Sequence, residues 1–127
     1  MEKYFGVCYY PELYPKEKQE AFIREDIENM RRARFNVVRM AEFCWCLMEP
    51  REGVYDFDWL EEIVDRLGQN GIYTVLCTPT ACQPVWMARR YPETLYVDNL
   101  GVQRSYGGRH YHCYNSPVFR GFTEKIC

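Results

Sequence analysis

The sequence has no excess of charge of one sign, since 16 Lys and Arg stand against 18 Asp and Glu for a formal net charge of −2. This balance excludes a protein that binds nucleic acid through a basic surface. No apolar run approaches the roughly 18 residues that a membrane span requires, so no membrane partner is expected. The start of the chain, MEKYFGVCYY, is neither basic nor sufficiently apolar for a secretory signal. A cytoplasmic location is therefore expected.

The seven cysteines form no C-x-x-C pair, and their number is odd. Without a secretory signal, these features argue against a disulfide framework. Cys44 and Cys46 are separated by a single residue, which is too close for the usual zinc-knuckle spacing. We therefore expect most of the cysteines to be small buried hydrophobic residues.

Aromatic residues, by contrast, are abundant, at 17% of the chain, and Tyr alone contributes 11 residues. The 127 residues and their 47% hydrophobic content suffice for one small domain with a core, but not for two. We therefore treat residues 1–127 as part of one domain in which the aromatic side chains are the unusual component.

Three short apolar runs, rich in β-branched and aromatic side chains, predict strands. These runs are residues 4–9, 37–41 and 72–78. They do not alternate cleanly, which is typical of strands covered on both faces in a parallel sheet. Amphipathic patterns over residues 16–34 and 59–70 predict two helices between the strands, and a third helix follows from Ser116 onward. The order β-α-β-α-β-α predicts an α/β fold with a parallel sheet and right-handed crossovers.

Local signals mark the ends of these helices. Asp58 with Glu61 predicts an N-cap and its capping box, and Gly71 predicts a helix stop. Ser116 followed by Pro117 predicts the N-cap of the third helix. The side chains expected to face the core are Ile23, Ile27, Met30, Leu60, Ile63, Val64, Leu67, Phe119, Phe122 and Ile126.

The predicted loops are unequal in length. The helices return to the next strand within a few residues, whereas residues 42–58 and 79–115 form long loops after the second and third strands. Long loops at the carboxyl ends of parallel strands form the functional face in both open α/β sheets and (β/α)₈ barrels. The turn after the first strand, YYPE at residues 9–12, is bulky and acidic rather than glycine-rich. A dinucleotide or P-loop site is therefore disfavoured.

The strands recur at nearly equal spacing, beginning at residues 4, 37 and 72. Eight such units need on the order of 250 residues, the usual size of a (β/α)₈ barrel. A three-stranded open sheet with an uncovered apolar edge is a poor independent fold. We therefore expect the first three βα units of a (β/α)₈ TIM barrel, an incomplete barrel in a truncated chain that ends inside a helix.

Several side chains on the predicted functional face are candidates for a site, and each has a structural alternative. Arg39 and Glu42 could form the wall of an anionic or hydroxyl-rich site, or a structural ion pair. The aromatic residues of segment 43–60 could stack on sugar rings, or could pack the loop and cap the helix. Trp86 could line a pocket, although a buried structural tryptophan is the more frequent case.

Residues 109–113 gather an unusual density of ligand-type side chains. Arg109 could donate paired hydrogen bonds to hydroxyls or carboxylates. His110 or His112 with Cys113 could bind zinc, but two ligands fall short of the usual four, so a metal would need residues outside this chain. The alternative is a polar loop with a buried cysteine.

Taken together, these segments resemble the N-terminal part of the catalytic barrel of the glycoside hydrolase family 42 β-galactosidases. The resemblance covers nearly the whole chain, and ordered motifs carry it. The motifs are FGVCYYPE (residues 5–12), NVVRMAEFCW (36–45), EPREGVYDFDWL (49–60), TPTA (78–81), PVW (84–86) and RHYHCYNSP (109–117).

The resemblance implies a (β/α)₈ barrel that hydrolyses terminal non-reducing β-D-galactose residues of β-D-galactosides with retention. Retaining glycosidases use two carboxylates about 5 Å apart, one as acid/base and one as nucleophile. In the family these are glutamates at the ends of strands four and seven, and the acid/base glutamate follows an asparagine. No Asn-Glu pair occurs in this sequence, so both catalytic groups are expected beyond Cys127.

The resemblance also implies roles for three residues of this chain. Arg109 matches the family's substrate-contacting arginine, and Arg39 looks like the barrel-wall arginine that contacts the nucleophile. Cys113 matches the first of four cysteine ligands of a structural zinc in some members, whose other ligands would lie downstream. Catalysis itself needs no cofactor. The complete enzyme is expected to be a homo-oligomer, as the family's trimers are.

Two other functions fit the same residues. One is a related glycosidase of the same clan, such as an α-L-arabinopyranosidase or a β-fucosidase, because those sugars share the ring pattern of galactose. The other is a non-catalytic sugar-binding remnant. Under the leading hypothesis, the isolated chain is expected to be inactive and poorly folded.

Overall fold

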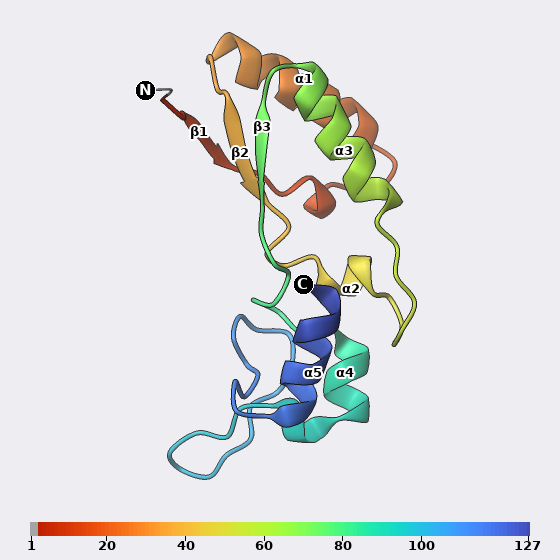
Figure 1. Cartoon of the computed structure of the whole chain (residues 1–127), viewed down its shortest axis with the longest axis vertical. Helices are drawn as coiled ribbons and strands as arrows, with labels where there is room; N and C mark the ends of the chain where they lie inside the picture. The colour runs from red at the N-terminus through yellow and green to blue at the C-terminus, as the bar shows by residue number, and fades with distance from the viewer. Residues whose placement is uncertain (1–2) are drawn as a thin grey trace. The chain divides into compact units, whose positions relative to one another are not determined.

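The computed structural model describes residues 3–127 and contains three strands and five α-helices (Figure 1). In chain order the elements are β1 (Gly6–Cys8), the 3₁₀ helix η1 (Pro11–Leu13), α1 (Gln19–Arg32), β2 (Val37–Met40), α2 (Trp45–Met48), α3 (Asp58–Gln69), β3 (Tyr73–Leu76), α4 (Val85–Arg90), the 3₁₀ helix η2 (Pro92–Thr94) and α5 (Pro117–Ile126). They fall into two compact units. The first contains the chain up to Met40 and Phe57–Cys77, and the second contains Ala41–Asp56 and Thr78–Cys127.

The first unit is a parallel sheet in the order β1-β2-β3, with α1 and α3 on one side of it (Figure 1). The register places Val38 of β2 between Val7 and Thr74. A 2.6 Å ion pair between Arg66 and Glu20 joins the two helices. The predicted α/β order and the parallel sheet are therefore confirmed, although the strands are shorter than expected.

Burial in the sheet differs from the prediction that both faces are covered. Val38 and Met40 of β2 are fully buried, but the side chains of β1 and most of β3 are exposed. Val75, for example, is 51% exposed. The prediction is wrong for the described residues because α1 and α3 cover one face only, and β1 and β3 each have a neighbouring strand on one side only.

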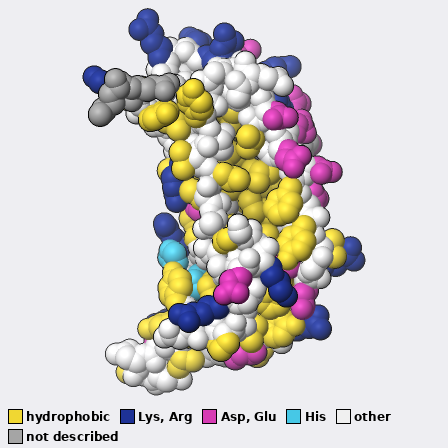
Figure 2. Space-filling model, viewed as in Figure 1, with side chains coloured by type: hydrophobic (Ala, Val, Ile, Leu, Met, Phe, Trp, Pro, Cys, Tyr) yellow, Lys and Arg dark blue, Asp and Glu magenta, His cyan; other side chains and the backbone are white. Residues whose placement is uncertain are grey.

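The helices of this unit match their predicted core faces. Ile23, Ile27 and Met30 of α1 are buried, as are three of the four residues predicted for α3, with Val64 half-buried. The solvent side of α3 is acidic, and Figure 2 shows Asp and Glu side chains gathered there. The two patterns therefore place the apolar stripes correctly.

The predicted helix starts need two corrections. α1 begins at Gln19 rather than at residue 16, because a turn closed by a 2.9 Å bond from Lys18 N to the Pro15 carbonyl oxygen precedes it. Asp58 is the first residue of α3 and not its N-cap, which is Phe57. The helix stop at Gly71 is confirmed, since this residue has φ +73°, a conformation that favours glycine.

The second unit is built around a core of four buried apolar side chains, Trp45, Met87, Phe119 and Phe122. α5 starts as predicted, because the Ser116 Oγ accepts a 3.3 Å bond from the Phe119 amide. The two segments read as long loops contain short helices, α2 in one and α4 and η2 in the other. Each short helix buries two apolar side chains, Trp45 and Met48 in α2 and Met87 and Ala88 in α4.

The cysteines are more exposed than predicted. Only Cys44 is buried, whereas Cys8, Cys46 and Cys127 are exposed and the other three are half-buried. All seven are free thiols in the described structure. No helix within residues 3–127 is both long and apolar enough to cross a membrane.

Candidate functional site

Arg109 lies in a glycine-containing loop that two contacts hold in place. The backbone amide of His110 donates a 3.0 Å hydrogen bond to the Ala81 carbonyl oxygen, and the Cys82 thiol lies 3.7 Å from the carbonyl oxygen of Gly108. A Cβ at Gly108 would clash with the ring of Tyr111, so a larger residue here would require that exposed ring to move. The loop that carries Arg109 is therefore fixed to the segment after β3.

The Arg109 side chain is exposed and points its charge at an aromatic ring. Its guanidinium carbon lies 5.4 Å from the centroid of the Phe43 ring, within the range of a cation–π interaction. No oxygen acceptor binds this guanidinium within residues 3–127. Its N–H groups are therefore unoccupied within residues 3–127, and a role as a substrate contact stays a prediction.

His112, a zinc candidate in the sequence, is buried in the second unit. It is 1% exposed, and its ring stacks on Phe119 with 4.0 Å between the centroids. Burial and the nearby charge of His110 lower the pKa of His112 to about 4, so the ring is neutral at pH 7. Neither ring nitrogen has a hydrogen-bond partner in the described structure.

The other zinc candidates do not assemble a site by themselves. His110 Nδ1 lies 2.6 Å from the Tyr114 hydroxyl, and Cys113 is a half-buried free thiol. Among residues 3–127, no three His, Cys, Asp or Glu side chains gather closely enough to hold a metal ion. The zinc prediction for Cys113 thus rests on ligands outside these residues.

Trp45, considered as a sugar platform, and Trp86, considered as a residue that lines a pocket, both donate hydrogen bonds to Glu49. Trp45 is fully buried, and its indole N–H donates a 2.8 Å hydrogen bond to Glu49 Oε2. The Gly53 amide donates to Glu49 Oε1 at 2.9 Å, and the Trp86 indole donates to the Glu49 carbonyl oxygen at 2.8 Å. Trp45 is therefore a packing residue of the second unit, whereas Trp86 is half-buried against its core.

Sequence reasoning did not identify the role of Glu49. Its carboxylate is 1% exposed and accepts bonds at both oxygens, so it anchors the turn at 49–53 rather than reacting. A glutamate four residues from both a tryptophan and a glycine is the signal that could have revealed it.

Of the predicted wall residues, Arg39 lies exposed on β2, whereas Glu42 is 4% exposed in the second unit.

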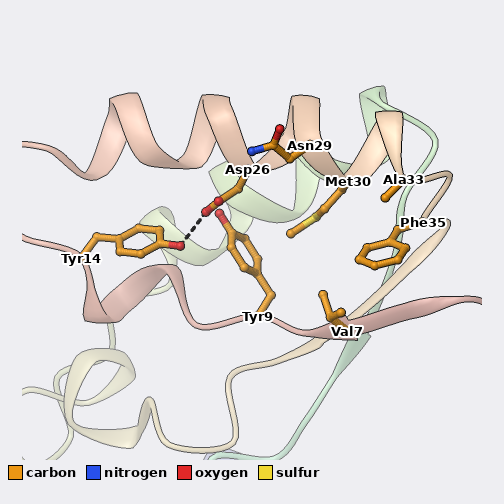
Figure 3. A pocket seen from close by; sticks show the side chains of 8 residues that line it. All are labelled: Val7, Tyr9, Tyr14, Asp26, Asn29, Met30, Ala33 and Phe35. Carbon is orange, nitrogen blue, oxygen red and sulfur yellow. Dashed lines mark hydrogen bonds between the residues drawn. The ribbon is translucent and has the colours of Figure 1, made fainter.

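The first unit contains a cavity of about 320 Å³ between β1 and α1 (Figure 3). The Tyr14 hydroxyl donates a 2.6 Å hydrogen bond to Asp26 Oδ2 at its edge. Burial, followed by this bond, raises the pKa of Tyr14 to about 12, and burial also raises the pKa of Tyr9. None of the residues predicted to form a site lines this cavity.

Comparison with known proteins identifies the family. The sequence profile of the glycoside hydrolase family 42 β-galactosidases matches residues 8–127. The chain belongs to this family. The family match therefore confirms the resemblance drawn from the sequence motifs.

Named relatives and solved structures agree with this assignment. A β-galactosidase of Thermus thermophilus is 46% identical over 121 residues, which are 95% of this chain and 18% of the relative. BgaH of Haloferax lucentense is 42% identical over the same share of this chain. The cold-adapted β-galactosidase of Rahnella sp. R3 superposes with a TM-score of 0.90 at 39% identity, over 95% of this chain and 18% of that one.

The chain thus spans about 18% of the length of the relatives it matches. Its three parallel βα units correspond to part of the TIM barrel of these glycoside hydrolase family 42 neighbours. The predicted fold class, the first three βα units of a (β/α)₈ barrel, is confirmed.

Proposed function

We propose that this family 42 chain is part of a retaining β-galactosidase that hydrolyses terminal non-reducing β-D-galactose residues in β-D-galactosides. The observation that carries the proposal is the family match over residues 8–127, since relatives from several organisms that match most of this chain are named β-galactosidases. No observation favours an arabinopyranosidase, a fucosidase or a non-catalytic remnant.

Arg109 is the substrate-binding residue of the proposal. Its exposed guanidinium, with no acceptor among residues 3–127, has N–H donors to offer to sugar hydroxyls. The neighbouring arginines of the same unit are engaged: Arg90 pairs with Glu52 at 2.6 Å, and Arg104 pairs with Asp98 at 3.1 Å. Arg109 is thus better suited than these two arginines to bind a neutral, hydroxyl-rich ligand.

The two catalytic carboxylates of a retaining mechanism are proposed to come from outside this chain. Glu49 is unsuitable because it is buried and both of its oxygens accept hydrogen bonds within its own turn. A retaining pair must lie about 5 Å apart on either side of the scissile bond, with one member able to give and recover a proton. The chain contributes barrel structure and substrate contacts to such a pair.

A hybrid enzyme tests the proposal. The matching 121-residue segment of the Thermus thermophilus β-galactosidase is replaced by its counterpart from this chain. We expect the hybrid to hydrolyse a chromogenic β-galactoside, and Arg109→Ala to lower kcat/KM by about tenfold to a hundredfold, the loss of one or two hydrogen bonds to substrate. A folded hybrid without activity, beside an active parent enzyme, would contradict the proposed function.

Cys113 is proposed as one thiolate ligand of a structural zinc that also needs ligands outside this chain. A soft thiolate suits zinc, and the half-buried Cys113 forms no disulfide. The zinc content of the hybrid should fall on Cys113→Ser. A zinc-free hybrid would make Cys113 a packing residue only.

A cytoplasmic location and a homo-oligomeric complete enzyme remain part of the same proposal. Cell fractionation and light scattering of the hybrid test them directly.

A further inference from the structure

The contact between Arg109 and Phe43 joins two segments that are far apart in the sequence. The guanidinium carbon lies 5.4 Å from the ring centroid, and both residues belong to the second unit. Phe43 is half-buried, whereas Arg109 is exposed. The ring therefore presents a partly solvated face to a charge that has no other partner within residues 3–127.

Both members of the pair are held by their surroundings. Phe43 lies directly before Cys44 and Trp45, which are 1% and 0% exposed. The loop of Arg109 is tied to Ala81 by the His110 amide and lies against the Tyr111 ring at Gly108. A long, flexible side chain between two anchored segments loses much of its rotational freedom.

A ring and a carboxylate hold an arginine in different ways. A carboxylate occupies the N–H groups, as Glu52 does for Arg90 and Asp98 does for Arg104. An aromatic face attracts the charge of the guanidinium and leaves its N–H groups unoccupied. Phe43 can therefore restrain Arg109 without competing with a ligand for its donors.

We propose that Phe43 is a positioning residue that pre-orients the Arg109 guanidinium for galactoside hydroxyls. The role rests on the function proposed above. It predicts that loss of the ring weakens sugar binding through Arg109, with no direct part for Phe43 in the chemical step.

The hybrid enzyme provides the test. Phe43→Leu should raise KM for a chromogenic β-galactoside and the inhibition constant of galactose by about tenfold, the equivalent of a partly desolvated cation–π contact, with a smaller change in kcat. Phe43→Tyr keeps a ring and should bind nearly as well as the unsubstituted hybrid. Tyr106→Leu is the matched control, because it removes a ring 5.8 Å from Arg89. The control should leave both constants unchanged.

A double-mutant cycle separates positioning from packing. In the Arg109→Ala background, Phe43→Leu should change neither constant further, because no guanidinium remains to be positioned. If the effects of Phe43→Leu and Arg109→Ala on these constants are independent and multiply, the inference is overturned. It is also overturned if Phe43→Leu lowers kcat and the melting temperature while KM stays constant. An active hybrid with unchanged KM on Phe43→Leu refutes the inference alone. An inactive, folded unsubstituted hybrid refutes the proposed function and the inference together.

Discussion

At the scale of single residues, burial and partners separate the candidates that sequence motifs treat alike. Arg109 keeps its donors free beside a ring, whereas His112, three residues later, is a buried, neutral ring. The carboxylate of Glu49, which lies in the motif EPREGVYDFDWL, accepts hydrogen bonds at both of its oxygens. The chemistry available to a side chain therefore depends on what already satisfies it.

The raised pKa of the Tyr14 phenol leads to a prediction at this scale. Its pKa is raised from 10.0 to about 12, so the folded state keeps a proton that the unfolded state releases near pH 10. The resulting stabilisation is fully present below pH 10 and is lost as the pH rises toward 12. Because the side chain is partly solvated, we expect this contribution to the free energy of unfolding to be roughly 1–2 kcal/mol at most.

Urea unfolding of the hybrid enzyme between pH 8 and pH 12 measures this effect, with Tyr14→Phe as the comparison. The substitution should be destabilising below pH 10, where the hydrogen bond to Asp26 is lost, and progressively less so above it. If the difference in stability between the hybrid and its Tyr14→Phe variant stays constant across this pH range, the raised pKa of Tyr14 is contradicted.

At the scale of elements, short-range signals decide where helices begin and end. Gly71 ends α3 and Ser116 caps α5, both as the sequence predicts, because these effects involve only neighbouring backbone groups. Asp58 fails as an N-cap because the chain becomes helical one residue earlier than the pattern indicates. The short helices α2 and α4 were not foreseen, since four and six residues give too little periodicity.

Ser116→Ala tests the cap of α5. Loss of the bond from the Phe119 amide to Ser116 Oγ should destabilise the helix by about 1 kcal/mol. Amide hydrogen exchange in α5 of the hybrid should become faster as a result. Ser105→Ala, at an exposed position of a loop, is the control and should leave this exchange unchanged. Equal exchange rates in the two variants would exclude a capping role.

At the scale of the whole molecule, the chain is an α/β segment whose sheet is covered on one face. Val7, Tyr73 and Val75 are 42%, 57% and 51% exposed on the two outer strands. Apolar strand surface of this kind is buried in closed barrels and favours association when it is open to water. The exposed apolar strand surface is therefore expected to lower the stability of the isolated chain, and a completed barrel would bury that surface.

The isolated 127-residue chain should accordingly bind a hydrophobic dye, melt without a cooperative transition, and hydrolyse no β-galactoside. The hybrid enzyme serves as the folded control in the same assays. A cooperative melting transition together with saturable galactose binding by the isolated chain would instead support an independent sugar-binding module.

The sequence by itself determined the βαβαβα order, the parallel sheet, the core faces of the main helices and the family. These properties follow from periodicity and helix caps, which act over a few residues, and from ordered motifs, which are continuous segments of the sequence. Only the tertiary structure decided that Phe43 lies beside Arg109 and that the Trp86 indole donates to the Glu49 carbonyl oxygen. Such contacts depend on how distant loops pack together, and no local pattern in the chain encodes that packing.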